Sequence, residues 1–435
     1  MSHSDAAFVV SNKPLPSLWA ATAPPGPDTP ALVESVHTDV LVIGAGYTGL
    51  STALHLAERG AQVTVVDAHE PGWGASGRNG GQVNPTVKHD PDELVRMLGP
   101  ERADPLIEAV SSSADLVFGL VERHQIDCSP MRRGWLQVAY SPDAVTGMHA
   151  RALQWQKRGV DVAMLDAAEV ARHMGTRAFA GGWRDGRAGS VQPLAYARGL
   201  ASAALAAGAR IHGQSRVTAL QRQGQRWLAN TAQGVSVTAE RVVIGTNGYT
   251  DALWPGLQQT LLAANSFIVA TEPLGDAGLD ILDDGTTAST SQRLLLYLRR
   301  DAEGRLLLGG RGNFADPRDP ADFAHLERSL EMLYPQLKQI PRQYCWAGRV
   351  AITPDAMPHV HEPAPGVSIA LGYNGRGVAL ATAMGQHLAQ RLLEPAYRFP
   401  FPVSSVRPIP FHGLQRFYIA AGVLWYSLLD RISHR

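Results

Sequence analysis

Three glycines near the N-terminus have the spacing of a turn that binds a dinucleotide. Gly44, Gly46 and Gly49 form the pattern G-x-G-x-x-G, with an apolar run at 40–43 before them and an apolar-periodic stretch at 50–58 after them. These flanks are typical of a buried parallel strand and of a helix. In such a unit the first glycine permits a tight turn, the second lets the backbone approach a pyrophosphate, and the third lets the helix pack on the strand. The helix N-terminus then presents N–H groups and the positive end of its dipole to the phosphates.

An acidic residue narrows the choice of dinucleotide. The segment 62–66 is predicted to form the second strand, and Asp67 follows at its end. An acid about 20 positions beyond the glycines binds the hydroxyls of the adenosine ribose, and its charge repels a 2′-phosphate. Glycine-rich turns also occur for packing reasons alone, but strand, helix, strand and acid together favour a nucleotide site.

Composition excludes several classes of protein and site. The chain has 435 residues, enough for two or three domains, and a formal net charge of zero, which gives no electrostatic attraction to nucleic acid or anionic membranes. Its two cysteines, Cys128 and Cys345, fit a reducing compartment and exclude a disulfide framework. No H-x-x-x-H, C-x-x-C or carboxylate cluster suggests a metal, and no basic segment followed by an apolar core suggests a secretory signal.

The elements that must position these residues fall into two groups. Strand-like runs at 266–271, 293–300 and 305–310 follow one another without intervening helices, which predicts a mixed or antiparallel sheet in a separate, substrate-facing domain. Farther on, an apolar strand at 367–371, a glycine turn at 372–377 and a helix at 378–393 repeat the opening arrangement. The sequence therefore predicts an α/β fold in which two glycine turns each point a helix N-terminus at a ligand.

Four segments together resemble the D-amino-acid oxidase and glycine oxidase structural family of flavoproteins. They are the first turn at 44–51, the loop Gly72-Trp-Gly-Ala-Ser-Gly-Arg-Asn-Gly-Gly-Gln82, Thr353-Pro-Asp355, and the second turn at 372–378. The resemblance runs from about Leu18 to Leu393 and is closest to the γ-glutamylputrescine oxidase branch. It implies a Rossmann-like FAD-binding domain of the glutathione-reductase type and a second domain with a mixed or antiparallel sheet.

We place the domain boundaries accordingly. Residues 1–36 are expected to form an N-terminal arm that Leu18 and Trp19 anchor on the domain surface. The remaining assignments are a discontinuous FAD-binding domain at 37–90, 145–250 and 341–395, a substrate domain at 91–144 and 251–340, and a tail with an apolar helix at 396–435.

The resemblance also implies an activity. FAD oxidises the C–N bond of an amine or amino acid, of a γ-glutamylputrescine-like kind, to an imine by hydride transfer to flavin N5. Water then hydrolyses the imine, and O2 is the expected acceptor of the electrons. Such a transfer needs chiefly positioning and a deprotonated nitrogen, and the sequence offers no convincing dedicated base.

The resemblance assigns roles to the cofactor residues as well. The first turn holds the pyrophosphate, Asp67 the ribose and Val217 the adenine, while the N–H groups of 375–378 lie by the flavin pyrimidine, where reduction places negative charge. The loop residues line the flavin or the ribityl chain. The full expected set is Gly44, Ala45, Gly46, Tyr47, Thr48, Gly49, Asp67, Ala68, Gly74, Ala75, Ser76, Arg78, Asn79, Gly80, Gly81, Gln82, Val217, Thr246, Asn247, Arg349, Asp355, Gly372, Asn374, Gly375, Arg376, Gly377 and Val378.

Departures from the family pattern leave two properties open. Where some relatives attach FAD through a cysteine this chain has Arg349, with Cys345 four residues earlier, so we expect noncovalent FAD and a packing role for Cys345. Sarcosine oxidase-like relatives use one lysine to bind the substrate carboxylate, and this chain has Ala379 at that position. They use a second lysine to promote reaction with oxygen, and this chain has no lysine around 305–310, the comparable strand.

The alternative functions are a dehydrogenase that passes electrons from a pipecolate- or proline-like amino acid to membrane quinone, and a non-catalytic FAD-binding partner subunit. A nicotinamide dehydrogenase fits least, because it leaves the second turn unexplained.

Four residues are candidates for the substrate pocket: Tyr297, Arg299, Arg311 and Tyr373. Arginine can hold a carboxylate with two hydrogen bonds, and an aromatic face can guide an amine. Arg299 is equally well interpreted as a solvated strand end. The remaining candidates have simpler interpretations: Trp254 and Trp346 as core, and His359 and His361 as solvated side chains on a turn.

The C-terminal segment 417–429 is apolar but too short to span a bilayer unaided. It is expected to form a helix that docks on the FAD-binding domain, or one that lies at a membrane surface with Trp425 and Tyr426 at the headgroups. We therefore expect a cytoplasmic protein, with peripheral contact to the inner face of the membrane through 411–432 as the alternative.

Overall fold

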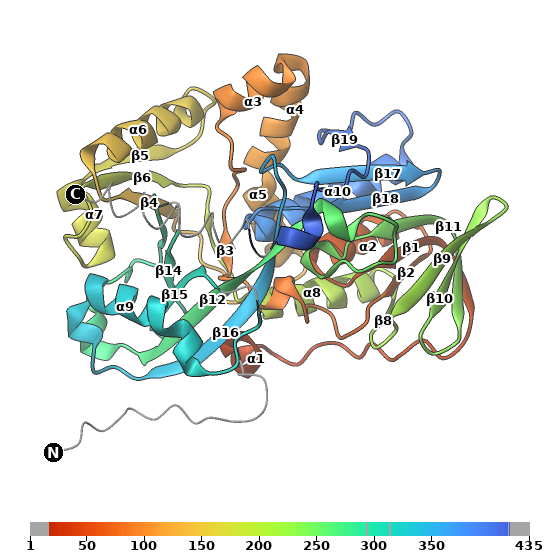
Figure 1. The fold of residues 1–435 in the computed structure, drawn as a ribbon, viewed down its shortest axis with the longest axis horizontal. Helices are drawn as coiled ribbons and strands as arrows, with labels where there is room; N and C mark the ends of the chain where they lie inside the picture. The colour runs from red at the N-terminus through yellow and green to blue at the C-terminus, as the bar shows by residue number, and fades with distance from the viewer. Residues whose placement is uncertain (1–16, 293–294, 313–314, 416, 418–435) are drawn as a thin grey trace.

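The computed structural model describes residues 17–292, 295–312, 315–415 and 417. Two large sheets lie side by side, and the chain crosses between them several times (Figure 1). The apolar helix expected at 417–429 lies outside the described residues except for Phe417. The two-sheet arrangement confirms the predicted fold class, a Rossmann-like domain with a second, mixed sheet.

The first sheet has nine strands in the order β19-β17-β18-β11-β1-β2-β8, with β9 and β10 forming a hairpin on β11. Its core from β18 to β8 is parallel, because each connection between these strands crosses over through other elements. The strands are β1 (Val36–Ile43), β2 (Val63–Val66), β8 (Arg210–His212), β9 (Val217–Gln223), β10 (Arg226–Thr231), β11 (Ser236–Ile244), β17 (His359–Ala364), β18 (Val367–Leu371) and β19 (Val403–Ser404).

The second sheet has eight strands in the order β16-β12-β15-β14-β13-β4-β6-β5 and is antiparallel except for the parallel pair β13–β4. Its core is built from leucines of β14 and β15 and from the helix α9, which packs on β12 and β15. The strands are β4 (Trp135–Ala139), β5 (Val162–Asp166), β6 (Gly181–Asp185), β12 (Leu262–Pro273), β13 (Thr287–Thr290), β14 (Tyr297–Arg300), β15 (Arg305–Arg311) and β16 (Arg342–Ile352). A short third sheet pairs β3 (Gln82–Val83) with β7 (Gly189–Ser190).

The helices that matter most for the site are the two that begin at glycine turns, since they pack against each other. Ser51 Oγ of α2 donates to the Thr382 carbonyl of α10 at 2.7 Å. The helices are α1 (Leu18–Thr22), α2 (Tyr47–Ala57), α3 (Pro91–Leu98), α4 (Pro100–Ser111), α5 (Ser113–Arg123), α6 (Pro142–Gln156), α7 (Ala167–Met174), α8 (Pro193–Ala206), α9 (Ala324–Leu333) and α10 (Gly377–Leu393).

Three local expectations differ from the structure. Strands β5, β6 and β16 lie in the second sheet, although the sequence assigns 145–250 and 341–395 to the FAD-binding domain, because their partners β4 and β12 are distant in sequence. The turn expected around His359 and His361 is wrong, because both belong to β17. The segment 165–171 predicts a short helix from Leu165, but the helix begins at Ala167, where Asp166 and Glu169 form a capping box.

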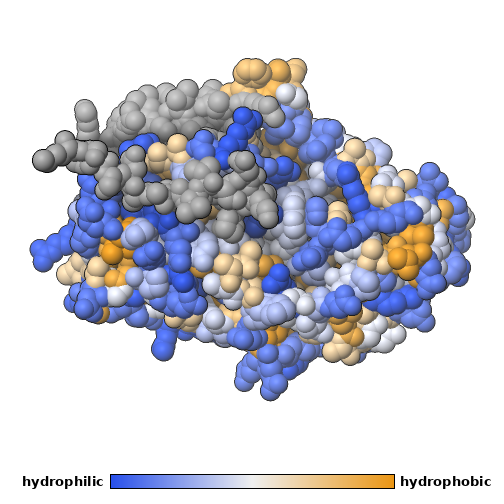
Figure 2. Space-filling view, turned by 90° about the horizontal axis from the view of Figure 1, so that it is seen from below, coloured by the Kyte–Doolittle hydropathy of each residue, from blue (hydrophilic) through white to orange (hydrophobic). Residues whose placement is uncertain are grey.

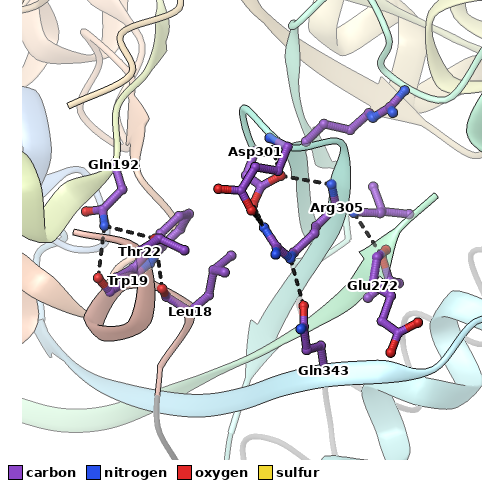
Figure 3. A network of polar contacts seen from close by, with 12 residues as sticks. Leu18, Trp19, Thr22, Gln192, Glu272, Asp301, Arg305 and Gln343 are labelled. Atoms are coloured by element: carbon purple, nitrogen blue, oxygen red, sulfur yellow. Dashed lines mark hydrogen bonds and ion pairs between the residues drawn. The ribbon is translucent and has the colours of Figure 1, made fainter. Parts of the chain in front are cut away.

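The N-terminal arm is held by buried contacts. Trp19 is 1% exposed, and Gln192 Nε2 donates to its carbonyl at 2.9 Å, while Thr22 Oγ1 donates to the Leu18 carbonyl (Figure 3). In the same view, Arg305 at the start of β15 donates to Gln343 of β16 at 2.8 Å and so clamps two strands of the second sheet. The expected anchoring by Leu18 and Trp19 is therefore confirmed, and it reaches the core rather than the surface alone.

The molecular face in Figure 2 is mostly hydrophilic, with apolar side chains in small separate patches. Among the helices of the described residues, none is long and apolar enough to cross a bilayer. Phe411, Leu414 and Phe417, at the start of the C-terminal tail, are exposed.

Candidate cofactor and substrate site

A cavity of about 870 Å³ lies between the two large sheets. On one side it is lined by the first glycine turn, the loop 73–82 and the ends of β2 and β11. On the other side it is lined by β12, β14, β15 and β16 of the second sheet, and the second glycine turn closes it next to α10. Both glycine turns therefore meet in one space, although more than three hundred residues separate them in the sequence.

The first glycine turn is shaped by close packing. A Cβ atom added to Gly49 would lie 1.8 Å from the Gly44 carbonyl oxygen, so no larger side chain fits there. Gly46 is the N-cap of α2, and the N-terminal end of this buried helix therefore faces the cavity. A helix N-terminus at a cavity favours a bound anion such as a phosphate.

Asp67, at the end of β2, organises the same turn. Its carboxylate accepts hydrogen bonds from the Ala45 N–H at 2.6 Å and the His69 N–H at 2.8 Å, and it lines the cavity. Burial raises the pKa of Asp67, while these two hydrogen bonds oppose the rise. The carboxylate is thus oriented by the backbone, and its outer edge can accept hydrogen bonds from ribose hydroxyls.

The glycine-rich loop is rigidly tied to its surroundings. Ser76 Oγ accepts from the Tyr47 N–H at 3.0 Å, and Asn79 Nδ2 donates to the Ser76 carbonyl at 2.9 Å. Trp19 Nε1 donates to the Asn79 carbonyl at 2.7 Å, and Trp346 Nε1 donates to the Arg78 carbonyl at 2.9 Å. Trp346 is buried, as expected, and Trp254 packs half-buried against the first sheet.

The second turn is joined to the first. Tyr373 OH and Thr48 Oγ1 are 2.6 Å apart, and burial raises the pKa of Tyr373 well above its usual range. Asn247 Oδ1, at the exit of β11, accepts from the Gly372 N–H at 2.9 Å, and Asn374 Oδ1 accepts from the Thr353 N–H at 3.0 Å. Tyr373 thus lines the cavity and ties the two turns together.

The second sheet supplies the facing wall. Tyr297 packs over Gly309, where an added Cβ would lie 2.1 Å from the ring, and its OH is 2.9 Å from Ser266 Oγ. Arg311 lines the cavity two residues farther along β15, and burial lowers its pKa. Ser289 of β13 completes this face and accepts from Trp135 Nε1 at 3.0 Å.

Arg299 has a different role from either one expected for it. It is 2% exposed, so it is not a solvated strand end, and it does not line the cavity. Its guanidinium donates to the Val191 carbonyl at 2.7 Å and to the Gly80 carbonyl at 3.4 Å, and burial lowers its pKa to about 10. Because its side chain faces away from the cavity, Arg299 holds the glycine-rich loop from behind.

The structure brings most of the remaining predicted residues together. Gly49, Gly81, Asp355 and Gly372 fall outside the cavity lining: the glycines act within turns, and Asp355 accepts from the Met357 N–H at 3.1 Å and pairs with His359. The predicted residues that line the cavity are Gly44, Ala45, Gly46, Tyr47, Thr48, Asp67, Ala68, Gly74, Ala75, Ser76, Arg78, Asn79, Gly80, Gln82, Val217, Thr246, Asn247, Arg349, Asn374, Gly375, Arg376, Gly377, Val378, Tyr297, Arg311 and Tyr373.

Sequence reasoning missed several lining residues, among them Asn84, Lys88, Trp73 and Tyr249. The signal that could have identified Lys88 is rarity, because the chain has four lysines and this one lies six residues after the glycine-rich loop. The two histidines of β17 do not line the cavity; His361 is buried, with Nδ1 at 2.9 Å from the Ser404 carbonyl, and burial lowers its pKa.

The site fits the two halves of FAD. A helix N-terminus and an oriented carboxylate suit a pyrophosphate and a ribose at one end, and a second helix N-terminus with a half-buried arginine lies at the other. Arg376 Nε has no partner among the described residues, so the site retains a free donor there. Cys345 is buried in the hydrophobic core of the second sheet and does not line the cavity. Burial raises the pKa of its thiol to about 12. No group of three His, Cys, Asp or Glu side chains in the described ranges could hold a metal ion.

Comparison with known proteins gives one consistent result. The chain is 33% identical over 422 residues to the probable oxidoreductase OrdL of Rhizobium meliloti (strain 1021), covering 95% of this chain and 97% of that protein. It is 32% identical over 430 residues to gamma-glutamylputrescine oxidoreductase of Escherichia coli (strain K12), covering 96% and 98%. Among solved structures, glycine oxidase from Geobacillus kaustophilus has the same fold, with a TM-score of 0.71, 22% identity and coverage of 83% and 96%.

Residues 39–391 match the family described as FAD dependent oxidoreductase (DAO), a range that contains both glycine turns and every described residue named above as lining the cavity. FAD is therefore the cofactor for which the cavity is built, and the substrates of such an enzyme are amines or amino acids. The chain belongs to the DAO family of FAD-dependent oxidoreductases.

Proposed function

We propose that the protein oxidises the C–N bond of an amine or amino acid of the γ-glutamylputrescine kind to an imine, which water then hydrolyses. The observation that carries this proposal is the pair of arginines in the cavity lining, with Arg376 at the second glycine turn and Arg311 beside Tyr297 on the facing wall. Cationic side chains suit a substrate that bears a carboxylate as well as an amine. The similarity to gamma-glutamylputrescine oxidoreductase over nearly the whole chain supports the same substrate class.

The residues have separable parts in this reaction. When bound, FAD supplies the two-electron oxidation of the C–N bond. Tyr297, held by Ser266 at 2.9 Å, provides an apolar face with a fixed hydroxyl for the substrate chain. The backbone N–H groups at the start of α10 stabilise negative charge that develops beside them. The second sheet and the glycine-rich loop line the cavity from two sides and so confine the substrate between them.

An anaerobic screen tests this proposal. FAD-loaded protein is mixed with polyamines, γ-glutamyl amines and cyclic imino acids, and the loss of flavin absorbance is recorded. We expect γ-glutamyl amines to bleach the flavin at the lowest concentrations. Bleaching by cyclic imino acids alone would favour the dehydrogenase alternative, and bleaching by no amine would favour a non-catalytic FAD-binding subunit.

The electron acceptor is part of the same proposal. We propose that O2 accepts the electrons in a cytoplasmic protein. The alternative acceptor is a quinone or another electron carrier. It is favoured by the exposed side chains of Phe411, Leu414 and Phe417, which suit peripheral contact with the inner face of the membrane. Peroxide formed in stoichiometric amount with the imine supports O2. Slow peroxide formation with rapid reduction of a quinone analogue supports the alternative.

We further propose that FAD is held without a covalent bond. Cys345 lies in the core of the second sheet, and Arg349 occupies the lining four residues later. Acid precipitation is therefore expected to release all the flavin into the supernatant, and flavin that stays with the protein would contradict this.

A further inference from the structure

The charged residues of the cavity lining are unevenly distributed. Its two carboxylates in the described part of the chain, Asp67 and Asp251, both lie at the nucleotide end, where Asp251 pairs with Arg216 at 3.0 Å. Beside the second glycine turn the lining carries Arg376 and Lys88 instead. A substrate ammonium group that enters this end therefore meets positive charge and no carboxylate in the described lining.

Lys88 lies on a segment that is fixed at both ends. Before it, β3 pairs with β7, and after it Asp90 forms an ion pair with Arg151 of α6. His89 Nε2 is 2.7 Å from the Asp355 carbonyl. Within the described residues, Lys88 itself takes part in no hydrogen bond or ion pair, although its side chain lines the cavity. Its backbone is thus held in place, and its amine is left available to a ligand.

Asn84 on the same segment has an unused acceptor. Its side chain is 3% exposed, and Nδ2 donates to Gln82 Oε1 at 3.2 Å, while Oδ1 has no partner among the described residues. A buried carbonyl oxygen without a hydrogen bond is unfavourable, so it favours a ligand that brings an N–H donor. Asn84 and Lys88 therefore offer an acceptor oxygen and an amine nitrogen on one wall.

The surroundings of Lys88 favour its neutral form. Its side chain is exposed and lines the cavity, and the charges that act on it are Arg376 and Arg151. Asp90 does not offset them, because it is engaged by Arg151, and His89 is engaged by the Asp355 carbonyl. Burial first, then Arg376 and Arg151, lower the pKa of Lys88 to about 7. A ligand that displaces water from the cavity strengthens this desolvation.

We propose that Lys88 is a catalytic residue that accepts a proton from the substrate ammonium group, while Asn84 Oδ1 accepts a second N–H of the same nitrogen. This inference rests on the proposed function, because amine oxidation requires a free lone pair on the substrate nitrogen. An N–H bond of the substrate ammonium breaks and an N–H bond forms at Lys88 Nζ. The substrate becomes a neutral amine, and Lys88 becomes an ammonium. FAD, when bound, would take up the two electrons of the C–N oxidation, and Lys88 then returns its proton to water.

The competing interpretation is a fixed cation that holds a substrate carboxylate. The two roles respond oppositely to replacement by arginine, which keeps the charge but does not act as a base at neutral pH. The rate of anaerobic flavin reduction, measured from pH 6 to pH 10 by rapid mixing, separates them. In the wild type we expect the rate to rise with an apparent pKa near 7, since the base is active only when neutral.

For Lys88→Met and Lys88→Arg alike, we expect the rate at pH 7 to fall on the order of 100-fold and the pH limb to move up toward the pKa of the substrate amine. Lys157→Met, at an exposed lysine that follows α6, is the matched control and should match the wild type. A Lys88→Arg variant with the wild-type rate would overturn the proposal in favour of a fixed cation. An unchanged pH profile in Lys88→Met would overturn it as well.

A second measurement does not depend on turnover. Lysines of FAD-loaded protein are labelled briefly with an amine-reactive reagent from pH 5 to pH 10, and mass spectrometry follows Lys88 with Lys157 as internal reference. We expect half-maximal labelling of Lys88 near pH 7, and a midpoint above pH 9 would refute the assignment. If no amine bleaches the wild-type flavin, the proposed function fails whatever the labelling shows. If the wild type is bleached and Lys88→Met behaves identically, only the role of Lys88 fails.

Discussion

The two glycine turns have the same backbone plan and opposite side-chain chemistry. Each follows a buried parallel strand and begins a helix, α2 or α10, whose N-terminus reaches the cavity. At the first turn the ionisable partner is a carboxylate, Asp67, bound by two backbone N–H groups, whereas at the second it is Arg376, close to Lys88. The backbone alone therefore favours anion binding at both turns. The side chains determine that the first turn suits the pyrophosphate and ribose of FAD and that the second suits the flavin and the substrate.

The largest expected effect separates the two turns by their packing. Gly49→Ala places a Cβ on the Gly44 carbonyl, and we expect it to lower the free energy of unfolding by about 3 kcal/mol and to abolish FAD retention. In Gly375→Ala the added Cβ meets no atom, so the only penalty comes from the left-handed backbone conformation, and we expect the free energy of unfolding to fall by about 1 kcal/mol. Urea denaturation of both variants gives these values. Equal losses would show that the turns are equally constrained.

The charge at the first turn is the next test. Asp67→Asn leaves one oxygen where two backbone N–H groups now find acceptors, so we expect FAD affinity to fall by about tenfold or more. Fluorescence titration of apoprotein measures this. Asp251→Asn, which removes a surface-paired carboxylate on the same side of the cavity, is the control and should change affinity far less. If both variants lost FAD affinity to the same extent, Asp67 would have no specific role in binding the cofactor.

The charge at the second turn can be removed in the same way. Arg376→Gln takes away the cation with the larger effect on Lys88, so the pKa of Lys88 should rise, on the order of one pH unit. The labelling midpoint of Lys88 checks the sign, with Arg311→Gln across the cavity as the comparison. A downward shift would show that Arg376 acts on Lys88 through packing rather than charge.

The smallest expected effect concerns the contact between the turns. Tyr373→Phe leaves the buried Thr48 hydroxyl without its partner and should cost about 1 kcal/mol. A double-mutant cycle with Thr48→Val should give a coupling energy of similar size. Additive losses would mean that the two turns are stabilised independently.

Local pattern predicted much of this site, because glycine spacing, strand length and helix periodicity are properties of short segments. The strands before both turns, the helices after them and the position of Asp67 follow from the sequence in this way. Sheet membership did not, since β16 pairs with β12 and β6 with β4 across long stretches of chain. The sequence also does not determine which face of a strand a side chain occupies. For this reason Arg299 is a candidate for the pocket in the sequence, whereas in the structure it bonds to the Val191 carbonyl outside the cavity.

Lys88 illustrates the remaining gap. A lone lysine after a glycine-rich loop has no periodicity and no motif, and its chemistry depends on Arg376 and Arg151, which lie far away in sequence. Asn84 was missed for the same reason, because only the fold shows that its oxygen is buried and unused. Functional groups of this kind become visible only when tertiary neighbours are known.

The packing of α2 on α10 also has a consequence for biosynthesis. Ser51 near the N-terminal end of the chain bonds to Thr382 near the other end, and the cavity takes its lining from Ile43 through Ala381. A ribosome must therefore release almost the entire polypeptide before the pocket is enclosed. Enclosure of the cofactor on all sides is accordingly expected only after synthesis has passed Ala381.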